Sequence, residues 1–351
     1  MIMRANELSG TRASWRANRG FFFVVIIYVS AALLASKYWN IPVNMHLYSE
    51  AFLIFGFSVT VILFSIISIL VMLERPLRLY PAVRNRLLVN RLPERLMVGL
   101  PVTLLLPVFF SLFTSIKGGI SRIVPFYADQ LLIDADRIIH GGLDAWIVLQ
   151  PYLDRAIITC ALNVIYNLWF IVMFVILFCV TFSVGNERVR SQYLIAFVLV
   201  WAVLGNVVAT LVSSVGPAFV FPFYNDSTFD PLMDYLRTTD KTYSVWALVG
   251  QNALLADAGL DGPRLGSGIS AFPSLHVAVA TLNAIYLWRF GRLLRWSGVA
   301  FLVAIQLGAV HLAWHYAIDG YASMLATPVI WMFAGWLSDL HRLPGTAKAA
   351  S

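Results

Sequence analysis

Long apolar runs recur along the whole chain and predict its architecture. A helix crosses a bilayer with about 20 consecutive, mostly apolar residues. Eight stretches of the 351-residue sequence meet or approach this length, each bounded by polar or charged residues: Phe21–Trp39, Ala51–Leu73, Leu96–Ser115, Ala156–Phe182, Tyr193–Val215, Leu275–Phe290, Ser297–Tyr316 and Ala322–Ser338. We therefore expect an all-α polytopic membrane protein with about eight transmembrane helices and both termini on one side.

The order of the runs suggests how the chain is organised. The first run follows several arginines, as in a signal peptide, but no Ala-x-Ala cleavage site follows it and it is longer than the usual apolar region. We interpret it as a retained span. No internal repeat or linker is apparent, so residues 1–351 are expected to form a single domain. Residues 1–95 hold the tail and the first two spans, and residues 96–341 hold the other six.

Composition excludes several classes of protein. Hydrophobic residues make up 60% of the chain and charged residues only 12%, about half of the roughly 25% typical of soluble domains. An ordinary soluble enzyme, a disordered chain and a disulfide scaffold are therefore excluded. The net charge of +7 would suit a nucleic-acid partner, but its distribution along the chain gives it another meaning.

The basic residues are concentrated in alternate connections. If the N-terminus is cytoplasmic, the cytoplasmic segments carry 17 of the 25 basic residues and 5 of the 18 acidic ones. This is the bias of the positive-inside rule. We expect a multi-pass protein of the cell (inner) membrane with both termini in the cytoplasm and no nucleic-acid partner. The two long connections, residues 116–155 and 216–272, are then extracytoplasmic.

The first long connection contains an amphipathic segment that starts near Asp129. Apolar and charged residues alternate there with helical spacing, and Gly141-Gly142 would end the helix. This pattern is typical of a helix lying on the outer membrane interface. Asp134, Asp136 and His140 are interpreted as its solvated face and not as a site.

Ionisable side chains inside membrane helices are costly and commonly mark a functional cavity. The seventh run ends with His311, His315 and Asp319, which share one helical stripe at i, i+4 and i+8. The sixth run begins at Ser274 and His276. Under the predicted topology both motifs lie on the outer side. They are therefore expected to meet, although His276 and His315 are 39 residues apart.

This set of residues suits phosphoryl transfer through a histidine. Asp319 can fix the tautomer of His315 and stabilise its imidazolium form. The neutral imidazole can then attack phosphorus and form a phospho-histidine. His276 can protonate the departing alkoxide and later deprotonate the attacking water or alcohol. Pro273 suits the first turn of a helix, whose free amides bind phosphate oxygens.

Other interpretations of the same residues are open. A single histidine in a membrane helix is about as often a packing residue as a catalytic one. A serine such as Ser274, taken alone, is most often a helix-start residue. His311, His315 and Asp319 could bind a metal ion, and two histidines could ligate haem, but we expect neither. An ion or lipid transporter is the rival from another class. Imidazoles of His276 and His315 about 4–8 Å apart favour shared catalysis, and a separation above about 15 Å leaves the transporter.

Two stretches resemble the type 2 phosphatidic acid phosphatase superfamily. Phe272-Pro-Ser-Leu-His276 and His315-Tyr-Ala-Ile-Asp319 are similar to that family's Pro-Ser-x-His and His-x-x-x-Asp motifs, in the same order on consecutive helices. The resemblance covers roughly the final third of the chain. It implies a six-helix core, with His315 as the nucleophile, Asp319 as its partner and His276 as the acid and base.

Two family motifs are missing. No Lys stands before Arg75-Pro76 with six residues between them, since Ser68 occupies that position, and the segment is on the cytoplasmic side. The Ser-Arg pair that the family places before the nucleophilic histidine is replaced by Gly308 and Ala309. That Arg normally clamps phosphate, so another outer-side cation is expected to replace it. The candidates are Lys117, Arg122, Arg137, Arg155, Arg237, Lys241 and Arg264.

Of these cations we favour Lys117, just beyond the third span, with Ser274 and His311 as further substrate-binding residues. Loss of the Arg, together with the Phe-Pro-Ser-Leu-His motif and the paired histidines of the last motif, resembles the inositol phosphorylceramide synthase branch. Members of that branch transfer a phospho-headgroup between lipids. We expect a membrane phosphatase or phosphotransferase that acts on lipid phosphate esters at the outer leaflet. No metal or organic cofactor is expected.

Overall fold

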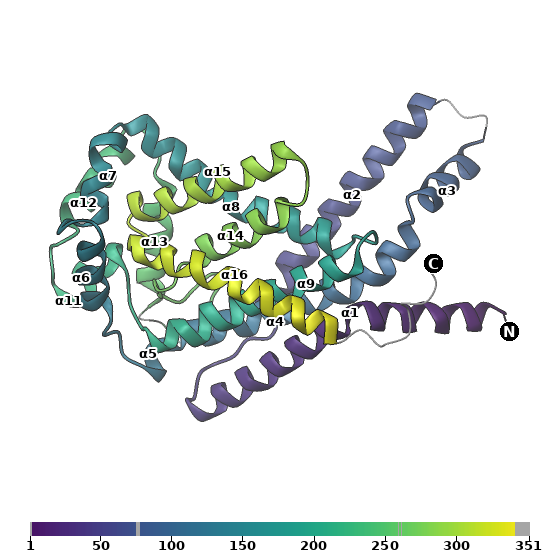
Figure 1. Cartoon of the computed structure of the whole chain (residues 1–351), viewed down its shortest axis with the longest axis horizontal. Coiled ribbons are helices and arrows are strands. Elements are labelled where there is room, and N and C mark those ends of the chain that lie inside the picture. The colour runs from purple at the N-terminus through teal and green to yellow at the C-terminus, as the bar shows by residue number, and fades with distance from the viewer. Residues whose placement is uncertain (1, 75–77, 259, 261, 341–351) are drawn as a thin grey trace.

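The computed structural model describes residues 2–74, 78–258, 260 and 262–340, so the Arg75-Pro76 pair lies outside the described residues. The protein is all-helical: 78% of it is helix, and the described residues contain no strand. Figure 1 shows the arrangement of these elements. In chain order they are α1 (Ile2–Tyr38), α2 (Ser49–Glu74), α3 (Leu79–Val89), α4 (Leu92–Gly118), α5 (Ile120–Ile123), α6 (Asp129–Ile139), α7 (Ala145–Leu153), α8 (Ala156–Thr181), α9 (Glu187–Leu199), η1 (Val200–Val208), α10 (Ala209–Leu211), η2 (Pro217–Phe219), α11 (Val220–Tyr224), α12 (Asp230–Asp240), α13 (Trp246–Asp257), α14 (Leu275–Leu287), α15 (Arg292–His311) and α16 (Ala317–Leu340).

Every predicted span coincides with a helix, and over the described residues these helices differ in length and hydropathy. Six helical segments among the described residues are long and apolar enough to cross a bilayer: Ala17–Tyr38, Leu92–Gly118, Ala156–Thr181, Glu187–Leu211, Arg292–His311 and Ala317–Leu340. The described part of α2 gives only two shorter apolar stretches. The sixth predicted span is α14, whose 13 residues extend about 20 Å, less than the roughly 30 Å hydrocarbon core.

The short helix α14 is enclosed by protein, which explains why its length need not match the bilayer. It packs against α15, α16, α8, α9 and η1, and the side chains from Val277 to Ala284 are all buried. Small residues such as Ala278 and Ala280 let the neighbouring helices come close. Its apolar run therefore reflects burial among helices and not contact with lipid.

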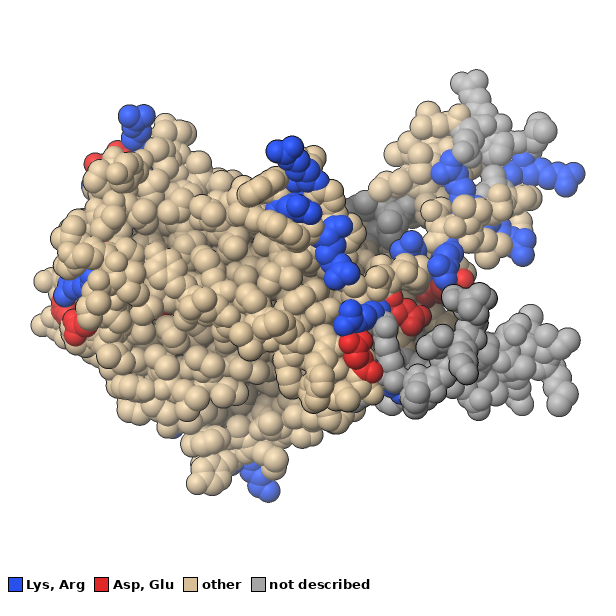
Figure 2. All heavy atoms as spheres, in the orientation of Figure 1, with Lys and Arg blue, Asp and Glu red and all other residues tan. Residues whose placement is uncertain are grey.

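Both long connections fold over one end of the bundle, which we name the site end. The first connection forms α5, α6 and α7, and the second forms η2, α11, α12 and α13; most of them lie on the left of Figure 1. Gly216 donates its backbone N–H to Asp129 Oδ1 (2.9 Å), which joins the two connections. Figure 2 shows a broad area without Lys, Arg, Asp or Glu between charged groups at the two ends of this face.

The amphipathic helix α6 forms as predicted, and Gly141 and Gly142 end it with φ values of 70° and 92°. Its interpretation as a solvated face is correct for Asp134, which is exposed, and wrong for the other two residues. Asp136 is buried and accepts a hydrogen bond from the backbone N–H of Ile318 (2.9 Å). His140 Nε2 lies 3.1 Å from the Tyr321 hydroxyl.

Candidate active site

The α14–α15 hairpin brings the two histidine motifs together. α14 leads away from the site end and α15 returns to it, so the start of one helix lies beside the end of the other. The ring centroids of His276 and His315 are 6.4 Å apart. This separation is within the range that favours shared chemistry over the transporter interpretation.

His315 is held by the first turn of α16. Its Nδ1 lies 3.2 Å from Asp319 Oδ2, and the backbone N–H of Tyr316 donates to the same oxygen (3.1 Å). Asp319 is fully buried. Because a carboxylate accepts hydrogen bonds, Nδ1 of His315 carries the proton and Nε2 keeps its lone pair. The backbone N–H of His315 also donates to the carbonyl of Ala309 (3.0 Å), which fixes the turn.

His276 is positioned by aromatic side chains of α8. Its ring stacks on Tyr166 with centroids 4.5 Å apart and lies 4.2 Å from the ring of Trp169. The Trp169 indole N–H donates to the carbonyl of His276 (2.9 Å). The half-buried imidazole lines the cavity described below. The rings therefore set its orientation while its nitrogens remain available for proton exchange.

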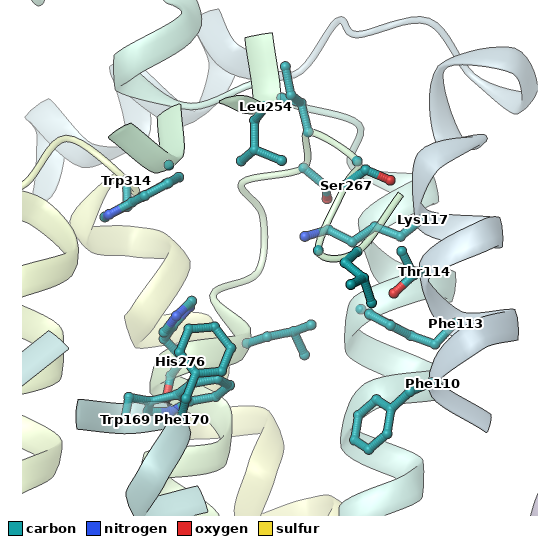
Figure 3. Close-up of a pocket in the computed structure, with 18 of the residues that line it drawn as sticks. Phe110, Phe113, Thr114, Lys117, Trp169, Phe170, Leu254, Ser267, His276 and Trp314 are labelled. Atoms are coloured by element: carbon teal, nitrogen blue, oxygen red, sulfur yellow. Dashed lines mark hydrogen bonds between the residues drawn. The ribbon is translucent and has the colours of Figure 1, made fainter. Parts of the chain in front are cut away.

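A cavity of about 650 Å³ joins these residues to Lys117. Figure 3 shows His276, Trp169 and Trp314 on one side and Lys117 and Thr114 on the other. The Lys117 amine points from the last turn of α4 into the cavity, and no hydrogen bond or ion pair joins it to a residue that the structure describes. Its positive charge is thus available to an anionic ligand.

A loop packs closely on the end of α4 and so confines Lys117. Gly268 has φ of 98°, and a Cβ atom there would lie 2.8 Å from the backbone nitrogen of Gly118. Any other residue at this position would push the loop away from α4, in addition to the strain of a positive φ. The glycine therefore sets the width of the cavity beside the lysine.

Ser274 and His311 do not reach the cavity, whereas Pro273 lines it from outside the helix. Ser274 is fully buried and caps α14 by accepting from the Val277 N–H, which agrees with a helix-start role. Pro273 precedes that cap, so it lies before the first turn of the helix and not within it. His311 is buried on α15, where its Nε2 lies 2.8 Å from the Thr159 hydroxyl of α8, and it is not among the lining residues.

The missing Arg has no direct replacement on α15. Ala309 is buried, and a Cβ atom at Gly308 would lie 3.1 Å from the Tyr166 ring. Of the seven candidate cations on the predicted outer side, Lys117 alone lines the cavity. Arg137 and Arg264 pair with Asp144 and Asp257 at 2.7 and 3.0 Å.

Two carboxylates that were not predicted as functional hold the turn that carries His315 and Asp319. Asp129 accepts from the backbone N–H groups of Val215 and Gly216 (2.9 Å each) and from the Tyr316 hydroxyl (2.9 Å). Asp136 holds the turn at Ile318, and burial raises the pKa of its carboxyl. Asp129 and Asp136 are seven residues apart and so share one helix face. That spacing is the only sequence signal for their role.

A family model described as the PAP2 superfamily matches residues 130–333, which is more than half of the chain and includes both motifs. The chain belongs to the PAP2 superfamily. Membership supports a membrane enzyme of the phosphatase or phosphotransferase type. No curated protein and no solved structure matches the chain. Lys117 and helices α1 to α4 lie outside the matched region.

Proposed function

We propose that this PAP2-superfamily member cleaves lipid phosphate esters at the extracytoplasmic leaflet through a covalent phospho-histidine on His315. The single observation that carries the proposal is the arrangement of three side chains. Asp319 contacts Nδ1 of His315 at 3.2 Å, and His276 lies 6.4 Å away, ring to ring, across the same cavity. That spacing leaves room for a phosphate group between the two imidazoles.

In the first step, Nε2 of His315 attacks the phosphorus atom. An N–P bond forms as the P–O bond to the lipid alcohol breaks. Protonated His276 gives its proton to the departing oxygen, so that the alcohol leaves neutral. Asp319 stabilises the positive charge that develops on the phosphorylated imidazole.

In the second step, His276 takes a proton from the acceptor, whose oxygen attacks phosphorus. The N–P bond breaks, and the neutral imidazole of His315 is restored. Water as the acceptor gives hydrolysis and inorganic phosphate, whereas a lipid hydroxyl gives transfer. The protein groups do the same work in both cases, so the acceptor alone separates the two reactions.

Lys117 is proposed to balance the charge of the phosphate. It replaces, from the opposite wall of the cavity, the Arg that the family carries near Ala309. The amide groups at the N-terminus of α14 add a second anion-binding element, since Leu275 and His276 line the cavity at that terminus.

A transfer reaction like that of inositol phosphorylceramide synthases is the second candidate. The altered clamp favours it, because Gly308 and Ala309 replace the pair that the family's phosphatases carry. The walls around His276 are also largely aromatic, with Tyr166, Trp169 and Phe170 in ring contact with it. Such walls suit a lipid acceptor better than a hydration shell.

The protein is proposed to lie in the inner membrane of a cell with both termini in the cytoplasm. The support is the excess of basic residues in alternate connections, together with the two long connections at the site end. A cysteine introduced at Asp134, which is exposed on α6, should react with an impermeant thiol reagent added outside intact cells. Reaction from the cytoplasmic side alone would reverse the orientation.

The function is tested by incubating the purified protein with a lipid phosphate that carries a radiolabelled phosphorus atom. Rapid acid-free quenching should trap label on the protein in an acid-labile, alkali-stable form, and His315→Ala should abolish it. Label in inorganic phosphate identifies hydrolysis, and label in a second lipid identifies transfer. Turnover by His315→Ala at the native rate would refute the mechanism.

A further inference from the structure

The cavity continues from the candidate active site into the bundle, away from the site end. Along α4 its lining residues run from Lys117 through Thr114 and Phe113 to Phe110. Seven residues of helix cover about 10 Å. The polar groups therefore lie at one end of the cavity, and only apolar side chains line the other end on this helix.

In each of three helices, the cavity-lining residue furthest from the site end is a phenylalanine. These residues are Phe52 on α2, Phe110 on α4 and Phe174 on α8. α4 ends at the site end, whereas α2 and α8 begin there, so all three are the residues furthest from the site end on their helices. We name this set the phenylalanine floor.

The three rings are in mutual contact. The centroids of Phe52 lie 6.1 Å from those of both Phe110 and Phe174, and Phe110 and Phe174 are 6.3 Å apart. Trp201 of η1 packs edge-on against Phe110 at 5.0 Å. Aromatic pairs at these distances attract one another. The three rings of the phenylalanine floor therefore hold α2, α4 and α8 together at this end of the cavity.

We propose that the phenylalanine floor is a binding subsite for the apolar chain of the substrate and limits the length of chain that the enzyme accepts. The inference rests on the proposed function, since the phosphate at His315 fixes where the chain starts. An apolar chain suits the cavity because its walls beyond Thr114 are Phe, Trp and Met side chains, and the interior is continuous with the candidate active site.

Phe52 is the most informative member of the floor. It lies on α2, outside the region that the family model matches, and α2 has few backbone contacts with the bundle beyond α4. Tyr48, just before α2, anchors this end of the helix through its hydroxyl, which lies 3.0 Å from the Thr114 hydroxyl. A helix added to the family core thus supplies one side of the floor.

The experiment compares single-chain alkyl phosphates from octyl to hexadecyl as substrates of the full-length protein in detergent. Phe52→Ala opens the floor and should raise kcat/KM for the longest chain relative to decyl phosphate by about tenfold or more, the discrimination typical of methylene-sized changes in apolar pockets. Ala51→Phe adds a ring to the cavity wall and should shift the preference toward shorter chains. Phe57→Ala is the matched control, because Phe57 is on the same helix but 72% exposed and does not line the cavity.

The outcomes separate this inference from the proposed function. If Phe52→Ala and Phe57→Ala have the same chain-length profile as the native protein, the phenylalanine floor is not a chain-binding subsite. Thermal shifts of the His315→Ala protein with the same alkyl phosphates measure binding without turnover. If adding Phe52→Ala changes the dependence of those thermal shifts on chain length, the subsite is upheld even if no phosphate is released. An unchanged dependence overturns it.

Discussion

Replacing Asp319 by Asn removes one charge while keeping the shape of the side chain. In the native protein the Nδ1–H of His315 and the backbone N–H of Tyr316 both donate hydrogen bonds to Oδ2 of Asp319, at 3.2 and 3.1 Å. The other oxygen, Oδ1, has no hydrogen-bond partner among the described residues. An Asn side chain can therefore place its oxygen at the Oδ2 position and keep both hydrogen bonds, while its NH₂ group takes the unpartnered position.

The magnitude follows from this geometry. With both hydrogen bonds kept, the loss is that of the negative charge facing the developing imidazolium, comparable to removing one transition-state stabiliser, about 10²–10³ in kcat or roughly 2.7–4 kcal/mol. If the amide turns over, its NH₂ faces Nδ1 and selects the wrong tautomer of His315, and the loss reaches about 10⁴. The fold should survive, because replacing a buried charge by a neutral group of similar shape leaves few unpaired atoms.

The assay measures phosphate release or transfer from a lipid phosphate, together with the thermal melting of the detergent-purified variant. Asp134→Asn is the matched control, since it makes the same chemical change on an exposed carboxylate. We expect a loss of at least 10² in kcat for Asp319→Asn, with a melting temperature close to native. Activity within tenfold of native in a folded Asp319→Asn protein would refute the assigned role of the carboxylate.

Three further substitutions test other parts of the site. His276→Ala should lower kcat by about 10²–10⁴. The loss of kcat should be smaller for an aryl phosphate than for an alkyl phosphate, because a good leaving group needs no proton. An equal loss for both substrates would contradict general acid catalysis. Lys117→Ala should raise KM by about tenfold, measured by substrate titration, whereas the exposed Lys37→Ala should not; an unchanged KM would assign phosphate binding elsewhere. Asp129→Ala leaves several buried N–H and O–H donors unpaired and should lower the free energy of unfolding by about 3–5 kcal/mol. Its melting temperature should therefore fall below that of the control variant Asp134→Ala, and equal melting temperatures would show that Asp129 does not stabilise the turn.

The meeting of the two motifs could be predicted because membrane topology restricts the possibilities. Once charge bias places the start of one run and the end of the next on the same side, His276 and His315 must lie near the same depth. The hairpin of α14 and α15 confirms this, with ring centroids 6.4 Å apart. The residues that do not reach the cavity, Ser274 and His311, could not be sorted in this way, because depth does not determine which neighbour a side chain faces.

Whether a predicted run crosses the bilayer could not be decided from its hydropathy, because an apolar run does not show what surrounds it. The run that starts at Leu275 is enclosed by helices, whereas much of the apolar run of α15 is not buried inside the protein. Only length separates the two cases. With 13 residues, α14 extends about 20 Å, too short to cross, and its polar start can therefore lie inside the protein beside the cavity.

For the same reason the sequence did not predict the contacts that Asp129 and Asp136 of α6 make with the turn of His315 and Asp319. In a soluble protein the apolar side of an amphipathic helix faces the core and the charged side faces water. In α6 the reverse holds for part of the helix, since Ile138 is 80% exposed while Asp129 and Asp136 are buried. A carboxylate is stable there only because backbone N–H groups are aimed at it, and those groups come from turns at Gly216 and Ile318, distant in sequence. In a membrane protein the pattern of apolar and charged residues alone therefore does not identify the inner face of a helix. The buried carboxylates beside the turn of His315 and Asp319 can be recognised only when the donors around them are known.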